Sequence, residues 1–433
     1  MEQNRSAAGE GGEGPGPKFA FLGGIGRALS SRNFFIYWVG NLVSVNGVWV
    51  NKIALGWLIW KLTEQAIWLG IIGFVSLIPL MFVGPVAGAV ADRIGARRVA
   101  LWALAVGFVV AALMGLLTVS KIITPWSLVG LAALQGILMS FDFPARQTLI
   151  PILVDRANLS AAIALNSSTY QVGLFIGPVI GGLVIIWAGI GAAFFFNAFA
   201  LLWLMGALFM IRMAPEKRRA MRSVDVIRDL VAGFRYAWGL PSLRLLLVLS
   251  FTTGFLIRPY AELLPGFADQ IFDRGADGLA MLNAAAGLGA LTGAAWLALR
   301  GRTGGLANIL ITAGLVASLF LILFPMSGNF PLALALLGLA ALCQVCVNIC
   351  INSLVQNVVD NALRGRIVSL NSSLSGGGAA LGALAMGGLA EVLGLRPPIA
   401  VMAGVMILFF LVLRPLIRRQ MTTLEAEPRP SRK

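Results

Sequence analysis

Three of the ionisable residues within the long apolar segments of this chain, where charge is costly, are Lys52, Arg258 and Glu262. Lys52 lies late in the segment 34–60, and Arg258 and Glu262 lie within the segment 243–265. An ionisable side chain in an apolar membrane environment marks a candidate functional site. The two cations predict a path for an anionic substrate, unless each one extends to the membrane surface. Arg258 and Glu262 are four residues apart, which predicts an ion pair on one helical face.

Carboxylates are the candidate proton carriers, because the chain contains no histidine. Glu262 fits this role, since surroundings of low dielectric constant favour the neutral form of a carboxyl group. A static salt bridge near the outer mouth is the alternative for Glu262. Asp142 is the second candidate, four residues before Arg146 at the inner end of the segment 126–143. A structural role at an inner gate is the alternative for Asp142.

Polar side chains recur every four residues in one apolar segment, at Gln344, Asn348 and Asn352. This spacing places them on one face of a helix. In a membrane, such a face lies against a cavity or a partner helix rather than lipid. Asn41 gives the first apolar segment a similar polar character. We therefore expect these four amide side chains to line a substrate path.

The chain has three cysteines, Cys343, Cys346 and Cys350, and all lie in that same segment. Their spacing places the three thiols on one helical face, and soft metal ions favour thiolate ligands. Cysteine is also a small apolar residue that is common in helix packing, and no histidine or carboxylate joins the group. We predict no bound metal, with this cysteine face as the alternative.

The elements that position these residues are membrane-spanning helices. Of the 433 residues, 58% are hydrophobic and 12% are charged, and the mean hydropathy is +0.88, which excludes a soluble globular protein. One crossing of the membrane takes about 20 apolar residues. The sequence therefore predicts an all-α membrane protein with twelve spans, at 34–60, 67–91, 99–119, 126–143, 163–187, 190–211, 243–265, 278–299, 306–325, 332–352, 367–392 and 397–416.

The distribution of basic residues predicts the orientation of these spans. Of the 33 basic residues, 26 fall in alternate connections and in the two terminal segments, and only four fall in the other loops. Basic residues collect on the cytoplasmic side of membrane proteins. Both termini are therefore expected in the cytoplasm. The net charge of +15 is explained in the same way, and we expect no nucleic-acid partner.

The spans divide into two groups of six, joined by a long basic connection. In that connection, apolar residues at helical spacing from Val224 to Trp238 predict an amphipathic helix along the membrane surface. The expected organisation is a disordered cytoplasmic tail (1–30), an N-terminal six-helix bundle (31–211), a cytoplasmic linker (212–242), a C-terminal six-helix bundle (243–416) and a basic cytoplasmic tail (417–433).

The two halves of the chain repeat each other at an offset of 205 residues. Nine of the 24 residues in 154–177 are identical to those in 359–382, and the same offset places Gly88 on Gly293. One register across distant regions predicts duplication of a six-helix unit. Such parallel repeats are typical of transporters.

The connection between the second and third spans reads Gly88-Ala-Val-Ala-Asp92-Arg93-Ile-Gly95-Ala-Arg97-Arg98. With the duplication, it resembles the major facilitator superfamily, whose loop reads G-x-x-x-D-R-x-G-R-R. The resemblance covers about residues 30–415 and implies two pseudo-symmetric bundles. It also implies a gate at this loop, where an acid flanked by arginines exchanges partners between conformations. In the second half Leu297 stands in place of the acid, which departs from a symmetric gate.

A second motif lies on the fifth span and reads Gly173-x-x-x-Gly177-Pro178-x-x-Gly181-Gly182. It resembles the helix-5 antiporter motif of the superfamily's drug–proton exporters. The resemblance implies export by exchange with protons. Close packing of helices through small residues is the alternative.

A third resemblance narrows the match within the superfamily. It rests on Phe141-Asp142-Phe143-Pro144-Ala145-Arg146-Gln147 and on Ala164-Leu165-Asn166-Ser167-Ser168. These stretches are similar to the branch of enterobactin-type siderophore exporters and transmembrane secretion effectors. The branch implies a secondary active transporter, and we expect a proton-coupled exporter of a small anionic or amphipathic metabolite that works by alternating access.

Two alternatives remain open at this point. The branch includes permeases of magnetosome membranes, so the chain could transport iron or an iron chelate in an intracellular membrane. It could also be a membrane scaffold that does not transport. Enzymatic activity is not expected, because the chain lacks histidine and a phosphate-binding loop.

The expected partners are a small-molecule substrate and the lipid bilayer, and the expected oligomeric state is a monomer. The expected location is the bacterial cytoplasmic membrane or an intracellular membrane derived from it. A proton gradient supplies the driving force in this hypothesis, and no cofactor is expected.

Overall fold

The chain forms twelve long apolar helices, which confirms the prediction from hydropathy. The computed structural model describes residues 23–211, 234–302, 304–360 and 363–420, without the side chains of residues 84–86, 88, 89 and 92. Nearly all of these described residues are helical, and none of them lies in a strand. Twelve of the helices are long and apolar enough to cross a membrane. The chain is therefore a multi-pass membrane protein.

The first half begins with a short helix and continues with six spans. Gly95 (φ 104°) and Gly189 (φ 84°) form one-residue turns between spans, with backbone angles that residues other than glycine rarely adopt. The helices are α1 (Gly23–Ser30), α2 (Arg32–Thr63), α3 (Ala66–Ile94), α4 (Ala96–Val119), α5 (Pro125–Leu153), α6 (Leu159–Ala188) and α7 (Ile190–Met210), with a 3-10 turn (Arg156–Asn158) before α6.

The second half also contains six spans, and the first of these is broken. It consists of α9 (Pro241–Leu256), α10 (Tyr260–Gly266) and a five-residue π-helix (Phe267–Ile271). A turn over residues 257–259 separates α9 from α10, because Pro259 has no N–H to donate to the preceding turn. The other spans are α11 (Gly275–Arg300), α12 (Leu306–Met326), α13 (Phe330–Val358), α14 (Arg364–Leu393) and α15 (Arg396–Arg419).

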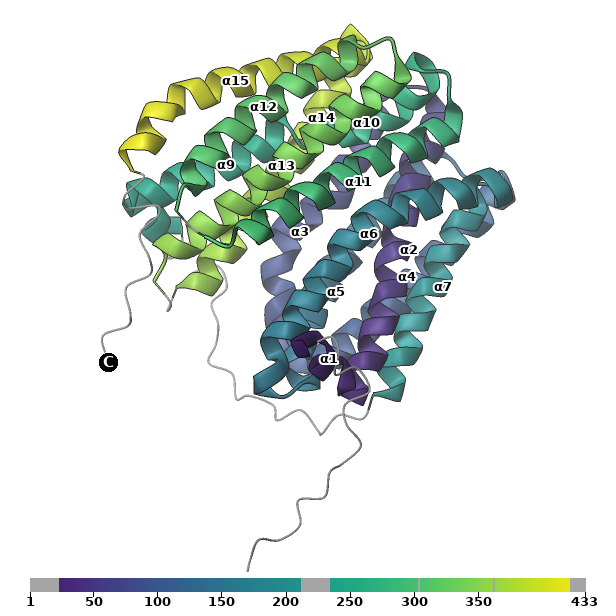
Figure 1. Ribbon diagram of the computed structural model, residues 1–433. Coiled ribbons are helices and arrows are strands. Elements are labelled where there is room, and N and C mark those ends of the chain that lie inside the picture. The colour runs from purple at the N-terminus through teal and green to yellow at the C-terminus, as the bar shows by residue number, and fades with distance from the viewer. Residues whose placement is uncertain (1–22, 212–233, 303, 361–362, 421–433) are drawn as a thin grey trace, which may run out of the picture.

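The spans pack as two six-helix bundles, one from each half of the chain. Figure 1 shows α2 to α7, in purple to teal, beside α9 to α15, in teal-green to yellow. Two pairs of helices form most of the contact between the bundles, α3 with α14 and α6 with α11. These pairs are related by the duplication, because each joins the second or fifth span of one half to the fifth or second span of the other.

The bundles approach each other most closely at one end. A Cβ on Gly70 of α3 would lie 2.6 Å from the carbonyl oxygen of Ala383 and 3.0 Å from the Cα of Gly387, both on α14. Only glycine permits backbones to pack at this distance. This end carries the connections at 64–65 and 189, which the basic residues predict to lie outside the cytoplasm. We call it the outer end.

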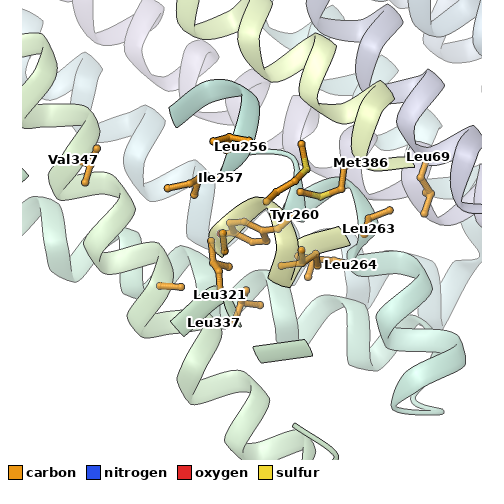
Figure 2. Close-up of a cluster of buried hydrophobic side chains, with 14 of the residues drawn as sticks. Leu69, Leu256, Ile257, Tyr260, Leu263, Leu264, Leu321, Leu337, Val347 and Met386 are labelled. Atoms are coloured by element: carbon orange, nitrogen blue, oxygen red, sulfur yellow. The ribbon is translucent and has the colours of Figure 1, made fainter. Parts of the chain in front are cut away.

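The helix α10 is held in an apolar core that both bundles share. Tyr260, Leu263 and Leu264 of α10 are buried in the same cluster as Leu69 of α3 and Met386 of α14 (Figure 2). Between membrane helices, this arrangement is stabilised by van der Waals packing of the apolar side chains rather than by their removal from water. The core therefore fixes the position of α10 between the bundles, and with it the polar residues on the other face of this helix.

The predicted amphipathic helix is described only at its end. Residues 234–239 are helical, and the side chains of Phe234 and Trp238 are exposed. Most of the linker, at 212–233, and the tails at 1–22 and 421–433 lie outside the described residues. The linker helix, the two disordered or basic tails and the bundle boundaries therefore stay predictions.

Candidate functional site

A cavity of about 550 Å³ lies between the two bundles. Side chains of α2, α3 and α6 line one wall, and those of α10, α11, α13 and α14 line the other. Six of the residues that the sequence placed on a substrate path or in a coupling role line this cavity, namely Lys52, Arg258, Glu262, Gln344, Asn348 and Asn352.

An ion pair crosses the cavity from one bundle to the other. The Nζ atom of Lys52 on α2 lies 3.0 Å from an Oε atom of Glu262 on α10. Glu262 is the more buried partner, with 16% of its side chain exposed against 44% for Lys52. A Cβ on Gly73 of α3 would lie 3.0 Å from the Cγ of Glu262, so the carboxylate is inserted against the N-terminal bundle.

The direct contact predicted between Arg258 and Glu262 does not form, although the two charged groups interact electrostatically. Arg258 lies in the turn between α9 and α10, so the two residues do not share one continuous helix. The side chain of Arg258 is exposed, lines the cavity, and forms no ion pair with a described residue. The break at Pro259 thus leaves the guanidinium group facing the cavity and leaves Glu262 to Lys52.

Amide side chains form part of the C-terminal wall. Asn352 donates a hydrogen bond to the carbonyl oxygen of Asn348 (2.9 Å) and accepts one from Asn371 of α14 (3.0 Å). Asn283 of α11 donates to the carbonyl oxygen of Leu279 (2.9 Å). These bonds orient polar groups within a wall that is otherwise apolar.

Two further carboxylates of the C-terminal bundle bind the N-terminal bundle at the outer end. Asp269 accepts hydrogen bonds from Lys61 Nζ (2.8 Å) and from Trp60 Nε1 (2.9 Å). Glu391 accepts one from the backbone N–H of Ile67 (3.2 Å). These two carboxylates and Glu262 therefore all belong to the C-terminal bundle, and the groups that donate to them belong to α2 and α3 of the N-terminal bundle.

Asp142 and Asn41 lie inside the N-terminal bundle and away from the cavity lining. Asp142 forms a buried ion pair with Arg146 on the same helix. Arg146 also donates to Asn41 (3.1 Å) and to Ser44 (3.3 Å), and Asn41 donates to Asn166 (3.0 Å). The expectation that Asn41 lines the substrate path is therefore corrected, because the buried guanidinium group takes its side-chain oxygen as an acceptor.

The glycines of the fifth span pack this helix against its neighbours. A Cβ on Gly173 or Gly177 would overlap Val45 or Trp49 of α2, and one on Gly181 would lie 3.3 Å from the Cα of Val50. A Cβ on Gly182 would overlap Ala280 of α11 in the other bundle. Pro178 lines the cavity. Close packing thus accounts for the spacing of the glycines, and an antiport role for the motif stays a prediction.

The predicted gate loop is described in part. Gly95 forms the turn between α3 and α4, and Arg97 donates to the carbonyl oxygen of Phe209 on α7 (3.4 Å). Arg93 and Arg98 are exposed. Gly88 belongs to α3, and the side chain of Asp92 lies outside the described part of the structure. A gate at Asp92 therefore stays a prediction.

The three cysteines lie on α13, and one of them contacts α11. Cys346 and Cys350 are buried and Cys343 is partly buried. The thiol of Cys346 donates to the carbonyl oxygen of Gly293 on α11 (3.7 Å). Within the described residues, no group of three or more histidine, cysteine, aspartate or glutamate side chains is placed to hold a metal ion.

The cavity also contains polar and aromatic residues that sequence reasoning missed. Tyr170 and Gln171 of α6, Trp49 of α2 and Asn283 of α11 all line it. The ammonium group of Lys52 lies 5.8 Å from the centre of the Trp49 ring, within range of a cation–π interaction. A usable signal was present for Asn283, since it is the one amide residue in the apolar segment 278–299.

Comparison with known proteins agrees with this architecture. The model of the transmembrane secretion effector family matches residues 27–432. The multidrug efflux pump Tap of Mycolicibacterium fortuitum is 26% identical, over 88% of this chain and 95% of that protein. The enterobactin exporter EntS of Escherichia coli O1:K1 is 30% identical, over 72% of this chain and 74% of that protein.

The staphyloferrin A transporter of Staphylococcus aureus is 28% identical over 56% of this chain, and the match spans 61% of that protein. One similar solved structure is that of a bacterial homologue of the human lysosomal transporter Spinster, in an inward-facing and unoccupied conformation. Its TM-score is 0.69 at 15% sequence identity, and the match covers 92% of this chain and 98% of the homologue. The human organic anion transporter MFSD10 has a TM-score of 0.62 at 19% identity, over 88% and 99%. These structures share the fold.

A structural role for the buried ion pair of Asp142 and Arg146 can be tested with a single and a double variant. Asp142→Leu alone leaves the guanidinium group buried without its carboxylate, which costs about 3–5 kcal/mol, whereas Asp142→Leu with Arg146→Met removes both charges and is close to neutral. We expect the melting temperature of the purified protein to fall in the single variant and to recover in the double variant. Proton-coupled transport by the double variant excludes Asp142 as a proton carrier. If the double variant recovers the melting temperature but loses only proton coupling, Asp142 does not have a purely structural role.

Proposed function

The chain belongs to the transmembrane secretion effector family of the major facilitator superfamily, and from this premise we propose that it is a secondary active exporter of small anionic metabolites of the siderophore type. The observation that carries the proposal is the cavity between the bundles, which contains an arginine without an ion-pair partner among the described residues. The relatives Tap, EntS and the staphyloferrin A transporter support export of drugs or siderophores.

The charges of the cavity favour an anionic substrate over a cationic drug. Lys52, Arg258 and Glu262 are the charged residues among those that line it. Two cations against one carboxylate leave an excess of one positive charge in surroundings of low dielectric constant. A substrate carboxylate or catecholate satisfies Arg258 by charge-assisted hydrogen bonds. A cationic substrate instead brings a third positive charge next to Arg258.

The remaining lining fits a ligand that is polar at several points. Gln344 and Asn348 of α13, Asn283 of α11 and Gln171 of α6 offer amide groups, and Tyr170 adds an aromatic ring. Binding cavities combine apolar walls with a few placed polar groups that fix the orientation of the ligand. A small metabolite with several oxygen atoms matches this combination better than a purely apolar drug.

The ion pair of Lys52 and Glu262 supplies a physical basis for coupling to protons. An anionic substrate that reaches Lys52 competes with Glu262 for the ammonium group. Once released in surroundings of low dielectric constant, the carboxylate is stabilised by taking up a proton. Substrate binding and proton binding are then linked through one residue, and by reciprocity protonation of Glu262 favours binding of the anion.

Transport by alternating access agrees with the way the bundles meet. Three contacts join the bundles between the cavity and the outer end. They are the ion pairs Lys52–Glu262 and Lys61–Asp269 and the close contact of Gly70 with α14. Rocking of two repeats around a central site requires such contacts to break when the cavity opens outward. The proposed location is the bacterial cytoplasmic membrane, with the small-molecule substrate and the lipid bilayer as partners.

The substrate proposal predicts a selective loss of affinity in Arg258→Gln. We expect the affinity for a siderophore that carries a carboxylate group to fall about tenfold, ~1.4 kcal/mol, because one charge-assisted contact is removed. The affinity for its neutral methyl ester should not change. Binding to the purified protein is measured for both compounds, with Arg244→Gln, an exposed arginine of α9 outside the cavity lining, as the matched control. An equal loss for acid and ester refutes recognition of the anion by Arg258.

The coupling proposal predicts the behaviour of Glu262→Gln in proteoliposomes. Glutamine keeps the shape of the side chain but cannot titrate, so proton-driven export should be lost while exchange of substrate for substrate continues. The matched control is Glu391→Gln, which removes another carboxylate that contacts the N-terminal bundle but lies outside the cavity lining. Export by Glu262→Gln with an unchanged pH dependence assigns the proton to another residue.

A further inference from the structure

A second cavity lies on the outside of the C-terminal bundle, between α12 and α15. It has a volume of about 220 Å³. Its polar lining consists of Asn308 and Thr312 on α12 and Arg414 and Arg418 on α15, and three aliphatic side chains of α12 complete it. None of these residues belongs to the substrate cavity. The site is therefore separate from the proposed transport function.

The four polar residues lie at one depth in the membrane. Asn308 and Thr312 belong to the first two turns of α12, and Arg414 and Arg418 to the last two turns of α15. The two helices run antiparallel along each other (Figure 1), so the start of one lies beside the end of the other. This is the end opposite the outer end, where the basic residues predict the cytoplasmic surface.

A close contact bounds the cavity toward the middle of the membrane. A Cβ on Gly314 of α12 would overlap the ring of Phe410 on α15, and this ring is fully buried. Phe410 lies one turn before Arg414, and Gly314 lies two residues after Thr312. The helices are therefore held together next to the cavity, which gives it a fixed wall.

The charges of this cavity are not compensated within the described part of the chain. Arg414 and Arg418 are four residues apart on one helix, a spacing at which like charges repel. No carboxylate lines the cavity, and neither arginine forms an ion pair with a described residue. An anion between the two guanidinium groups removes the repulsion and accepts hydrogen bonds from both. Asn308 and Thr312 provide further donors on the opposite wall.

The surface beyond the cavity is apolar and faces the lipid. It continues along both helices toward the middle of the membrane, where exposed aliphatic side chains lie on α12 and on α15. They are Leu319, Leu323, Leu408, Leu411 and Val412. A ligand with an anionic head and hydrocarbon chains covers the cavity and this surface together, whereas a free anion covers only the cavity.

We propose that the cavity between α12 and α15 binds the phosphodiester headgroup of an anionic phospholipid in the cytoplasmic leaflet. Arg414 and Arg418 hold the phosphate, and Asn308 and Thr312 bind the polar part of the headgroup. The acyl chains lie on the aliphatic surface of the two helices. Basic pockets between membrane helices on the cytoplasmic side have the chemistry that such headgroups require.

The test uses the purified full-length chain in detergent and dioleoylphosphatidylglycerol as the probe. Bound lipid is counted by native mass spectrometry, and dioleoylphosphatidylcholine and inorganic phosphate serve as comparison ligands. We expect the double variant Arg414→Ala/Arg418→Ala to bind phosphatidylglycerol about tenfold more weakly. The matched control, Arg244→Ala/Arg419→Ala, removes the same charge from the cytoplasmic ends of α9 and α15 outside the cavity and should bind as the parent does.

A second variant, Asn308→Leu/Thr312→Val, changes no charge and tests the opposite wall. We expect it to weaken binding of phosphatidylglycerol several-fold at an unchanged melting temperature. Equal losses in Arg414→Ala/Arg418→Ala and in its charge-matched control overturn the proposal in favour of general attraction to a basic surface. Equal binding of phosphatidylcholine, or saturation by inorganic phosphate at the same concentration, overturns the assignment to an anionic lipid.

Glu425 and Glu427 of the C-terminal tail are the competing occupants within the chain, and they lie outside the described residues. Their double substitution by glutamine should leave lipid binding unchanged. If it increases binding while Arg414→Ala/Arg418→Ala has no effect, the tail fills the cavity and the lipid proposal is wrong.

Discussion

The cost of placing charge in a membrane is the constraint on which the rest of this structure depends, and the ion pair of Lys52 and Glu262 is where the chain meets it. Glu262 is mostly buried, and its nearest cation belongs to the other bundle. The contact that stabilises the carboxylate is therefore also a contact that closes the two bundles on each other. Because a buried charge without a partner is strongly destabilising, the charge of Glu262 and the contact between the bundles are linked through one residue.

Much of this could be predicted from the sequence, because the period of a helix and the thickness of a membrane fix the twelve spans and the face on which Gln344, Asn348 and Asn352 lie. The partner of Glu262 could not be predicted. That pairing depends on the turn at Pro259, which takes Arg258 out of helical register, and on contacts between bundles that no local pattern encodes. The position of Asn41 could not be predicted for the same reason, because a polar helix face in the sequence does not reveal that Arg146 binds its side chain.

The duplication predicts the arrangement of the bundles but not their chemistry. Asn166 and Asn371 occupy equivalent positions at the 205-residue offset, yet Asn166 accepts a hydrogen bond from Asn41 of α2 and Asn371 donates to Asn352 of α13. The carboxylates Glu262, Asp269 and Glu391 that contact the other bundle all come from the second half. The second half thus supplies the acceptors and the first half the donors, so the two repeats share a fold and have different roles in closing the cavity.

The most direct test of this account measures the distance between the bundles at the outer end. Spin labels at Val119 on α4 and Met326 on α12, both exposed, report it by pulsed electron spin resonance in a chain whose three cysteines are replaced by alanine. The account predicts that Lys52→Glu, which places two carboxylates together, lengthens this distance. It predicts that Lys52→Glu with Glu262→Lys, which restores an ion pair, shortens it again. A distance that does not respond to Lys52→Glu, or that the reversed pair fails to restore, would contradict the claim that this ion pair holds the outer end closed.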